Sequence, residues 1–303
     1  MLRVLVTDGM DQDAVKQLRD MGYEVVEQYY EPEMLGEALQ GFDVVVIRSK
    51  TKIRKPIIDV AVEGKLKLII RAGVGIDNID HRYAEEKGIK VRNTPNSSSA
   101  SVAELAIGHM FAVSRFIGIA NVTMRDGKWE KKSYKGVELA GKTLGLVGFG
   151  RISRETAKRA EALGMNICYT DIIGKAEGYD NYEFCTLDAL LQKSDYVSLH
   201  IPFFKEHGAT ITKEKLELMK NTAFVINCAR GGVVDEKALI QALNEGKIAG
   251  AAFDVFEEEP TKNIELVNHP KVCVTPHIGA STAEAQKRIG QETIAVIKEF
   301  ASK

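Results

Sequence analysis

Short, wholly apolar runs alternate with helical patterns along almost the entire chain, and this alternation limits the possible folds more than any other feature. The run Val44–Ile47, for example, reads VVVI and contains no polar residue. A strand of this kind is typical of a parallel sheet that helices cover on both faces. The alternation therefore predicts an α/β protein with doubly wound parallel sheets, built from right-handed strand–helix–strand units.

The alternation falls into two series. The first predicts strands over residues 2–7, 23–28, 43–48, 66–71 and 89–93, with helices over 13–21, 34–40, 56–63 and 83–87. The second predicts strands over 143–148, 166–170, 196–200, 223–228, 250–255 and 272–275, with helices over 155–163, 186–192, 212–218 and 236–246. Long helical stretches over 98–119 and 282–300 flank the second series.

The second series opens with a turn typical of dinucleotide binding. It reads GLVGFGRIS, in which Gly148 allows a tight turn and Gly150 lets a pyrophosphate approach the start of a helix. Ser153 stands where a third glycine is usual, but it leaves both phosphate-facing glycines intact. Asp171 ends the next strand, where a carboxylate can accept both ribose hydroxyls of NAD and would repel the 2′-phosphate of NADP.

The first series carries no such glycine pattern, because Thr7-Asp-Gly9 follows its first strand. A chain of 303 residues suits two domains better than one. We expect a Rossmann nucleotide-binding domain over 98–280, inserted in a flavodoxin-like substrate-binding domain made of 1–97 and 281–303. A cleft between two such domains is a natural ligand site.

Composition excludes several other classes of protein. The formal net charge is −1, so nothing indicates binding to nucleic acid or to an anionic membrane. Four widely spaced cysteines form no Cys-x-x-Cys pair, which argues against a metal site or a disulfide framework. The N-terminus enters a strand directly, and no apolar run reaches the roughly 18 to 20 residues of a membrane span. We therefore expect a cytoplasmic protein without a bound metal.

Polar residues follow three strands of the second series. Hydride transfer needs an acid or base, a group that orients it, and a cation for the acid group of the substrate. His277 follows the last strand, Arg230 follows strand 223–228, and the acidic segment 254–260 follows strand 250–255. A histidine there could also be a loop residue without a role, and Ser281-x-x-Glu284 beyond it has the pattern of a capping box.

These segments resemble one known family. GFGRIS, NCARGGVVDE, AAFDVFEEEP and TPHIGAST occur here in the order and spacing of the D-isomer-specific 2-hydroxyacid dehydrogenases. The similarity extends over essentially the whole chain. IRSKT, RAGVGIDN, NTPN and DGKWEKK are most similar to the 3-phosphoglycerate dehydrogenase branch of that family, which implies NAD-dependent oxidation of 3-phospho-D-glycerate at the start of serine synthesis.

The resemblance implies roles for individual residues. Arg230 would bind the carboxylate and carbonyl of the substrate, His277 would be the acid/base, and Glu259 would orient it. The cofactor contacts would be Gly148, Gly150, Arg151, Ile152, Asp171, His200, Pro202, Cys228, Asp254 and Gly279. The substrate contacts would be Arg48, Ser49, Arg71, Val74 and Gly75.

The resemblance also implies a homodimer that forms through the nucleotide domain, with Lys131 or Lys132 reaching the partner's active site. Many relatives append a regulatory domain that binds serine. This chain ends about one helix after His277, so we expect no inhibition by serine through such a domain. Lys50, where some relatives carry arginine, and Ser98, near which they often place asparagine, depart from the family pattern.

Two alternatives stay open. The chain could be a hydroxypyruvate, glyoxylate or D-lactate type of dehydrogenase on the same scaffold. It could also be a binding protein that senses NAD, as in transcriptional corepressors of the same fold, which would bind nucleotide with negligible turnover.

Overall fold

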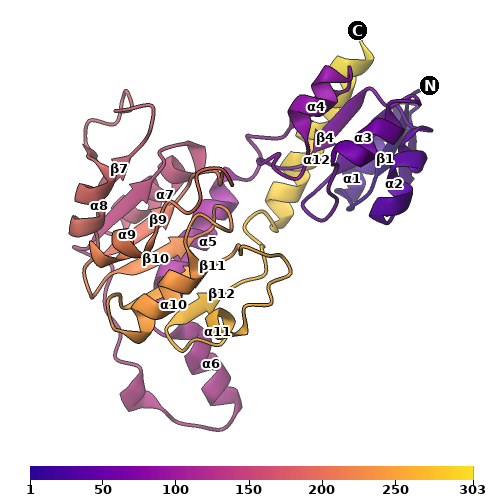
Figure 1. Cartoon of the computed structure of the whole chain (residues 1–303). Coiled ribbons are helices and arrows are strands. Elements are labelled where there is room, and N and C mark those ends of the chain that lie inside the picture. Colours follow the sequence, from indigo (N-terminus) through magenta and orange to yellow (C-terminus); the bar gives the residue numbers. More distant parts are fainter. Residues whose placement is uncertain (303) are drawn as a thin grey trace. The chain divides into compact units, whose positions relative to one another are not determined.

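The computed structural model describes residues 1–302, which form two compact units (Figure 1). Unit 1 consists of Met1–Ser98 and the segment that starts at Ala280, and unit 2 consists of Ser99–Gly279. Both units contain one sheet in which every pair of neighbouring strands is parallel. The predicted α/β class with two doubly wound parallel sheets is therefore confirmed.

The sheet of unit 1 has the strand order β2-β1-β3-β4-β5, which is the flavodoxin-like arrangement. Its strands are β1 (Arg3–Val6), β2 (Glu24–Glu27), β3 (Val44–Ile47), β4 (Leu68–Arg71) and β5 (Lys90–Asn93). Its helices are α1 (Gln12–Asp20), α2 (Pro32–Leu39), α3 (Lys55–Ala61), α4 (His81–Glu86) and α12 (Ala283–Ala301).

Alternate residues of β3 explain why its sequence is wholly apolar. Val44 and Val46 pack in a core with α1 and α12, whereas Val45 and Ile47 pack in a second core with α2, α3 and α4. Both faces of the sheet are thus covered, as expected for a buried parallel strand. The last helix, yellow in Figure 1, belongs to the same unit as the first strands of the chain.

The sheet of unit 2 has the order β12-β11-β10-β9-β6-β7-β8, and its strand order reverses between β6 and β9. Its strands are β6 (Thr143–Val147), β7 (Asn166–Thr170), β8 (Glu183–Phe184), β9 (Tyr196–Leu199), β10 (Phe224–Asn227), β11 (Gly250–Phe253) and β12 (Val272–Val274). Its helices are α5 (Ser99–Ser114), α6 (Ile117–Arg125), α7 (Arg151–Ala162), α8 (Leu187–Lys193), α9 (Lys213–Glu217), α10 (Glu236–Asn244) and α11 (Ile264–Val267), with a short 3-10 helix η1 (Lys131–Ser133).

Helices α5 and α7 cover one face of this sheet, and α8, α9, α10 and α11 cover the other. In doubly wound sheets, ligands bind beyond the carboxyl ends of the strands, near the point where the strand order reverses. The short elements β8 and α11 were not among the predicted ones.

The single helix predicted over 98–119 is wrong. The structure has two helices, α5 and α6, bent by 63° and separated at Phe116, whose φ of 58° is left-handed. The cause lies outside the helix, because Val137 N–H donates to the Ser114 carbonyl (3.1 Å). That bond ties the end of α5 to a distant segment, and the Phe116 ring contacts Tyr134 nearby. Sequence periodicity cannot detect such a contact.

The capping box predicted at Ser281 is also wrong by one residue. Thr282 caps α12, since its side chain accepts a hydrogen bond from Ala285 N–H (3.1 Å). Both residues carry a hydroxyl group, so the pattern alone does not distinguish them.

Over residues 1–302, no single helix is long and apolar enough to cross a membrane. The bent pair α5 and α6 meets the length and composition criteria only when the two are combined, and half of α5 is buried in the core of unit 2.

Candidate functional site

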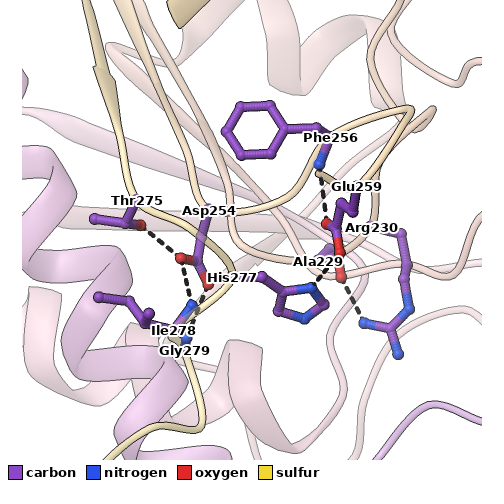
Figure 2. Close-up of polar contacts among 9 residues, drawn as sticks. All are labelled: Ala229, Arg230, Asp254, Phe256, Glu259, Thr275, His277, Ile278 and Gly279. Atoms are coloured by element: carbon purple, nitrogen blue, oxygen red, sulfur yellow. Dashed lines mark hydrogen bonds and ion pairs between the residues drawn. The ribbon is translucent and has the colours of Figure 1, made fainter. Parts of the chain in front are cut away.

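Three adjacent strands of unit 2 bring the predicted catalytic residues together (Figure 2). Arg230 follows β10, Glu259 lies in the loop after β11, and His277 follows β12. His277 Nδ1 lies 2.7 Å from Glu259 Oε2, and the other carboxylate oxygen accepts Phe256 N–H (3.2 Å). Residues far apart in the sequence thus share one edge of the sheet, because parallel strands end at the same edge.

Electrostatics favour the ionised form of Glu259. Burial raises the pKa of its carboxyl group, but the hydrogen bond and charge of His277, the Phe256 amide and the Arg230 guanidinium together hold that pKa below its usual range. An ionised carboxylate can only accept, so His277 Nδ1 carries the hydrogen in this pair. The opposite ring nitrogen, Nε2, is then the one that can exchange a proton with a substrate.

The loop that carries Arg230 is shaped by a buried side chain. Asn227 Nδ2 donates to the Arg230 carbonyl (2.9 Å), and its Oδ1 accepts Ala229 N–H (3.1 Å). A Cβ atom at Gly231 would overlap the Phe256 carbonyl, so the loop after β10 lies directly against the loop that carries Glu259. The glycine after Arg230 is therefore needed for close approach of two backbones.

The turn that carries His277 is unusual. His277 has a φ of 54°, in the left-handed region that residues with a side chain seldom adopt. Asp254 is 1% exposed, and its carboxylate accepts hydrogen bonds from Thr275 Oγ1 (2.5 Å), Ile278 N–H (2.8 Å) and Gly279 N–H (2.8 Å). Figure 2 shows this carboxylate against the turn on either side of His277.

Two residues of this network were missed by sequence reasoning. Thr275 ends the predicted strand 272–275, and His109 lies within the predicted helical stretch 98–119, so neither stands out as a functional residue. The structure joins them, with His109 Nε2 3.0 Å from Thr275 Oγ1. Only the packing of α5 near the end of β12 reveals the pair, so no signal in the sequence could have found it.

The glycine turn after β6 has the features of an anion site. Gly148 has a φ of 83°, and a Cβ there would lie 2.6 Å from Ile201 Cγ2, so no other residue fits without movement. Gly150 is the N-cap of α7, and it has no side chain that could accept a hydrogen bond from the first amides of the helix. No atom of the described residues lies within 4 Å of the position that a Cβ would take there. The first amides of α7, including those of Arg151 and Ile152, therefore face a ligand position that suits a pyrophosphate.

Ser153 fits this turn without disturbing it. The side chain is completely buried, and its Oγ has no hydrogen-bond partner among residues 1–302. A serine hydroxyl at this position could bond to a nearby backbone carbonyl, but no such bond is formed within the described residues. Helix α7 still begins at Arg151, directly after the second glycine.

Asp171 lies immediately after β7, beside the glycine turn. Its Oδ2 accepts Phe149 N–H (2.7 Å), and its Oδ1 accepts Ile173 N–H (3.0 Å). Each carboxylate oxygen has a second lone pair, so both can still accept a ribose hydroxyl. The carboxylate thus holds the turn and remains able to bind a nucleoside.

The remaining predicted cofactor residues lie beyond the ends of other strands. His200 follows β9, its Nε2 is 3.0 Å from Ser198 Oγ, and burial lowers its pKa to about 4. Cys228 is buried, and burial raises the pKa of its thiol well above the usual value. Pro202 is exposed, and Gly279 is buried against Asp254. No contact to a cofactor follows from these positions alone.

Unit 1 holds the predicted substrate residues at the carboxyl ends of β3 and β4, where Ile47 and Arg71 are paired in register. Asp8 accepts Arg48 N–H (2.7 Å), and Asn78 Nδ2 donates to the Arg48 carbonyl (2.7 Å), which fixes the loop that also contains Ser49. These bonds fix the backbone from which the Arg48 side chain extends.

The turn after β4 completes this group. A Cβ at Gly73 would overlap the Arg71 guanidinium, which is folded back over the turn. The N–H groups of Val74 and Gly75 donate no hydrogen bond to any group in the described part of the chain. Consecutive backbone amides of this kind can bind an anion.

Comparison with known proteins identifies the family. Residues 107–279 match the family model "D-isomer specific 2-hydroxyacid dehydrogenase, NAD binding domain". D-3-phosphoglycerate dehydrogenase of Methanocaldococcus jannaschii is 47% identical over 293 residues, which are 96% of this chain and 56% of that protein. Hydroxypyruvate reductase of Thermotoga maritima is 47% identical over 297 residues, which are 96% of both chains. The chain thus spans only about half the length of the first of these relatives.

Solved structures agree with this assignment. A glyoxylate reductase from Paecilomyes thermophila has a TM-score of 0.87 and 30% identity, covering 96% of this chain and 92% of that one. The D-lactate dehydrogenase of Aquifex aeolicus, solved with NAD and lactic acid, has a TM-score of 0.86 and 28% identity, covering 99% and 96%. The chain therefore belongs to the D-isomer specific 2-hydroxyacid dehydrogenase family, and unit 2 contains the NAD-binding domain of that family.

Proposed function

We propose that this protein is an NAD-dependent dehydrogenase that oxidises 3-phospho-D-glycerate to 3-phosphohydroxypyruvate. The observation that carries the proposal is the His277–Glu259 pair, 2.7 Å apart, beside Arg230 in an NAD-binding domain. A polarised histidine next to a guanidinium is the set of groups that hydride transfer from a 2-hydroxy acid requires.

Each residue has a defined part in the reaction. Arg230 binds the carboxylate of the substrate, for which a guanidinium offers two parallel N–H donors. Neutral His277 takes the hydroxyl proton on Nε2 while its Nδ1–H stays bonded to Glu259. Bound NAD supplies the hydride acceptor. In the reverse direction, protonated His277 donates the same proton to the carbonyl oxygen.

Asp171 supports NAD over NADP as the cofactor. Its carboxylate lies beside the glycine turn. Asp171 follows that turn by about 20 residues, which is the separation at which a carboxylate binds the ribose of NAD in this type of domain. A 2′-phosphate would place a second negative charge against this carboxylate.

The choice of a phosphorylated substrate is supported by unit 1. Arg48 follows β3, Arg71 is the last residue of the adjacent parallel strand β4, and the amides of Val74 and Gly75 are available in the next turn. Two guanidinium groups and backbone amides can bind a substrate with two acidic ends, one phosphate and one carboxylate. The first relative reported above is named for phosphoglycerate.

A second candidate substrate is hydroxypyruvate, which lacks the phosphate. It is favoured by the hydroxypyruvate reductase of Thermotoga maritima, which matches over 96% of both chains. Phosphate selectivity distinguishes the two substrates.

The test is to measure kcat/KM for phosphohydroxypyruvate and hydroxypyruvate with NADH. We expect the phosphorylated substrate to be preferred about tenfold or more, since loss of charged contacts costs at least one factor of ten. Arg48→Ala should remove most of this preference. Lys67→Ala, at the opposite end of β4 from Arg71, is the matched control for a lost positive charge and should keep it. Equal use of both substrates by the unmodified protein would contradict phosphoglycerate as the substrate.

We also propose that the protein acts as a homodimer formed through unit 2. Helix α6 has no buried residue, and it exposes Ile117, Ile119, Val122 and Met124. Trp129 in the following segment is 77% exposed. Several exposed apolar side chains in one short segment are typical of a protein interface.

A further inference from the structure

A chain of hydrogen bonds runs from the core helix α5 to the turn that carries His277. His109 on α5 is buried, and its Nε2 lies 3.0 Å from Thr275 Oγ1. Thr275 Oγ1 in turn donates to Asp254 Oδ1 (2.5 Å). Because the single hydroxyl hydrogen of Thr275 is directed at Asp254, His109 Nε2 must be the donor to Thr275. The direction of each hydrogen bond from His109 through Thr275 to Asp254 is thereby fixed.

Asp254, the last residue of this series of hydrogen bonds, contacts residues on both sides of His277. Asp254 Oδ1 also accepts Ile278 N–H, and Oδ2 accepts Gly279 N–H, so the carboxylate holds residues on both sides of His277. Figure 2 shows Asp254 joined to Thr275, Ile278 and Gly279, while the imidazole points away from it toward Glu259. The aspartate therefore contacts the backbone of the turn and leaves the ring to its other partner.

The turn needs such a restraint. A left-handed φ is unfavourable in a residue with a side chain and persists only where the surroundings enforce it. His277 has a φ of 54°, and this conformation directs its ring toward Glu259. Relaxation to an ordinary φ would turn the ring away from the carboxylate, even if the fold of unit 2 were unchanged.

We propose that His109, Thr275 and Asp254 form a positioning relay that holds His277 in its catalytic orientation. The inference depends on the proposed function, in which His277 is the acid/base. Within this relay His109 and Thr275 touch no reacting atom, so they act only through Asp254 and the turn. A side chain that merely fills the core would affect stability but not the orientation of His277.

The first test compares two substitutions of Thr275. Thr275→Val keeps the shape but removes the hydroxyl, whereas Thr275→Ser keeps the hydroxyl. We expect Thr275→Val to lower kcat about ten- to hundredfold, because small misplacement of a catalytic group has effects of this size. The KM for NADH should change less than kcat, since the glycine turn is not touched and only Asp254 and Gly279 of the predicted cofactor contacts adjoin the relay. Thr275→Ser should recover most of kcat.

The second test makes the same comparison at His109. His109→Leu removes the donor, whereas His109→Gln can present a side-chain N–H at a similar position. We expect a lower kcat for the leucine variant and recovery with glutamine. Tyr196→Phe is the control for loss of a buried hydrogen bond on α5, because the Tyr196 hydroxyl bonds only Ser114 on that helix (2.6 Å). It should reduce stability without changing kcat.

A readout independent of activity completes the design. Protein labelled with ¹⁵N-histidine should show a His277 ring signal, assigned by its absence in His277→Gln, that changes in Thr275→Val and His109→Leu but not in Tyr196→Phe. The relay is overturned if kcat of folded Thr275→Val and His109→Leu equals that of the unmodified protein and the His277 signal is unchanged. If the unmodified protein reduces no 2-keto acid, the proposed function fails, and the His277 signal alone still decides whether the relay exists.

Discussion

At the scale of single residues, the two glycines of the turn after β6, Gly148 and Gly150, have different structural requirements. Gly148 has a left-handed φ, and a Cβ there would overlap Ile201, so the fold itself requires a glycine at this position. Gly150 has an ordinary φ of −79° and nothing within 4 Å of the position of a Cβ. The fold itself therefore does not require a glycine at position 150.

Gly150→Ala should leave the thermal midpoint within about 2 °C of the unmodified value but weaken NADH binding by at least about tenfold, as a methyl group would occupy the pyrophosphate position. Thermal unfolding and fluorescence titration with NADH measure the two quantities. Gly148→Ala is the comparison and should lower the midpoint as well. Unchanged NADH affinity in Gly150→Ala would place the pyrophosphate elsewhere.

His277 offers a second prediction at this scale. His277→Gln should lower kcat by about 10²- to 10⁴-fold, because it removes the proton acceptor on Nε2. The affinity for NADH should change little, since the glycine turn and Asp171 are untouched. Steady-state kinetics and NADH titration measure these effects, with His269→Gln as the control for replacement of a histidine outside the site. A variant that keeps more than a tenth of the turnover would rule out His277 as the acid/base.

At the scale of elements, the break at Phe116 changes what the helical stretch after unit 1 does. Helix α5 packs in the core and carries His109, whereas α6 exposes its apolar side chains. One continuous helix could not do both, because its axis would carry residues 117–125 along the same face of the sheet. The contact between Val137 and Ser114 therefore separates a core helix from a surface helix.

The apolar surface of α6 gives a prediction about assembly. Val122→Asp should weaken dimer formation about a hundredfold or more, since it would bury an unpaired charge in the proposed interface. Light scattering during gel filtration, over a range of protein concentrations, measures the mass. Ile264→Asp on α11, also an exposed apolar residue of unit 2, is the matched control and should leave the mass unchanged. A monomeric unmodified protein would contradict the proposed interface.

At the scale of the whole molecule, stability should depend on pH below neutrality. Burial lowers the pKa of His200 from 6.5 to about 4 in the folded protein. Between pH 6.5 and pH 4 the unfolded chain binds a proton on His200 that the folded protein does not bind. This contribution to stability is therefore complete above pH 6.5 and is lost as the pH falls toward 4. The lowered pKa values of His109 and Glu259 act in the same direction.

The free energy of unfolding should therefore be roughly 2–3 kcal/mol lower at pH 4.5 than at pH 7.5 from His200 alone. Urea unfolding at the two pH values measures this difference. His200→Asn cannot bind the proton and should reduce the difference by a similar amount. An equal pH dependence in both proteins would mean that His200 is solvated in the folded state.

Much of this architecture could be predicted from the sequence because the signals are local. Val44–Ile47 and the other apolar runs required strands that are buried on both faces, and the structure has them at the predicted places. The glycine turn and Asp171 were likewise readable, since a tight turn and a strand end leave their pattern in neighbouring residues. The two-residue strand β8 was missed because its side chains are exposed and show no apolar pattern.

The sequence by itself determined the parallel α/β architecture and the residues of the candidate site, since apolar runs, glycines and strand-end polar residues are properties of short segments. Only the tertiary structure decided how His277 is held. Its left-handed turn depends on Asp254, and Asp254 depends on Thr275 and on His109, which lies 166 residues from Thr275 along the chain. Hydrogen bonds across such separations are set by packing of whole elements, and packing leaves no pattern that a local reading of the sequence can detect.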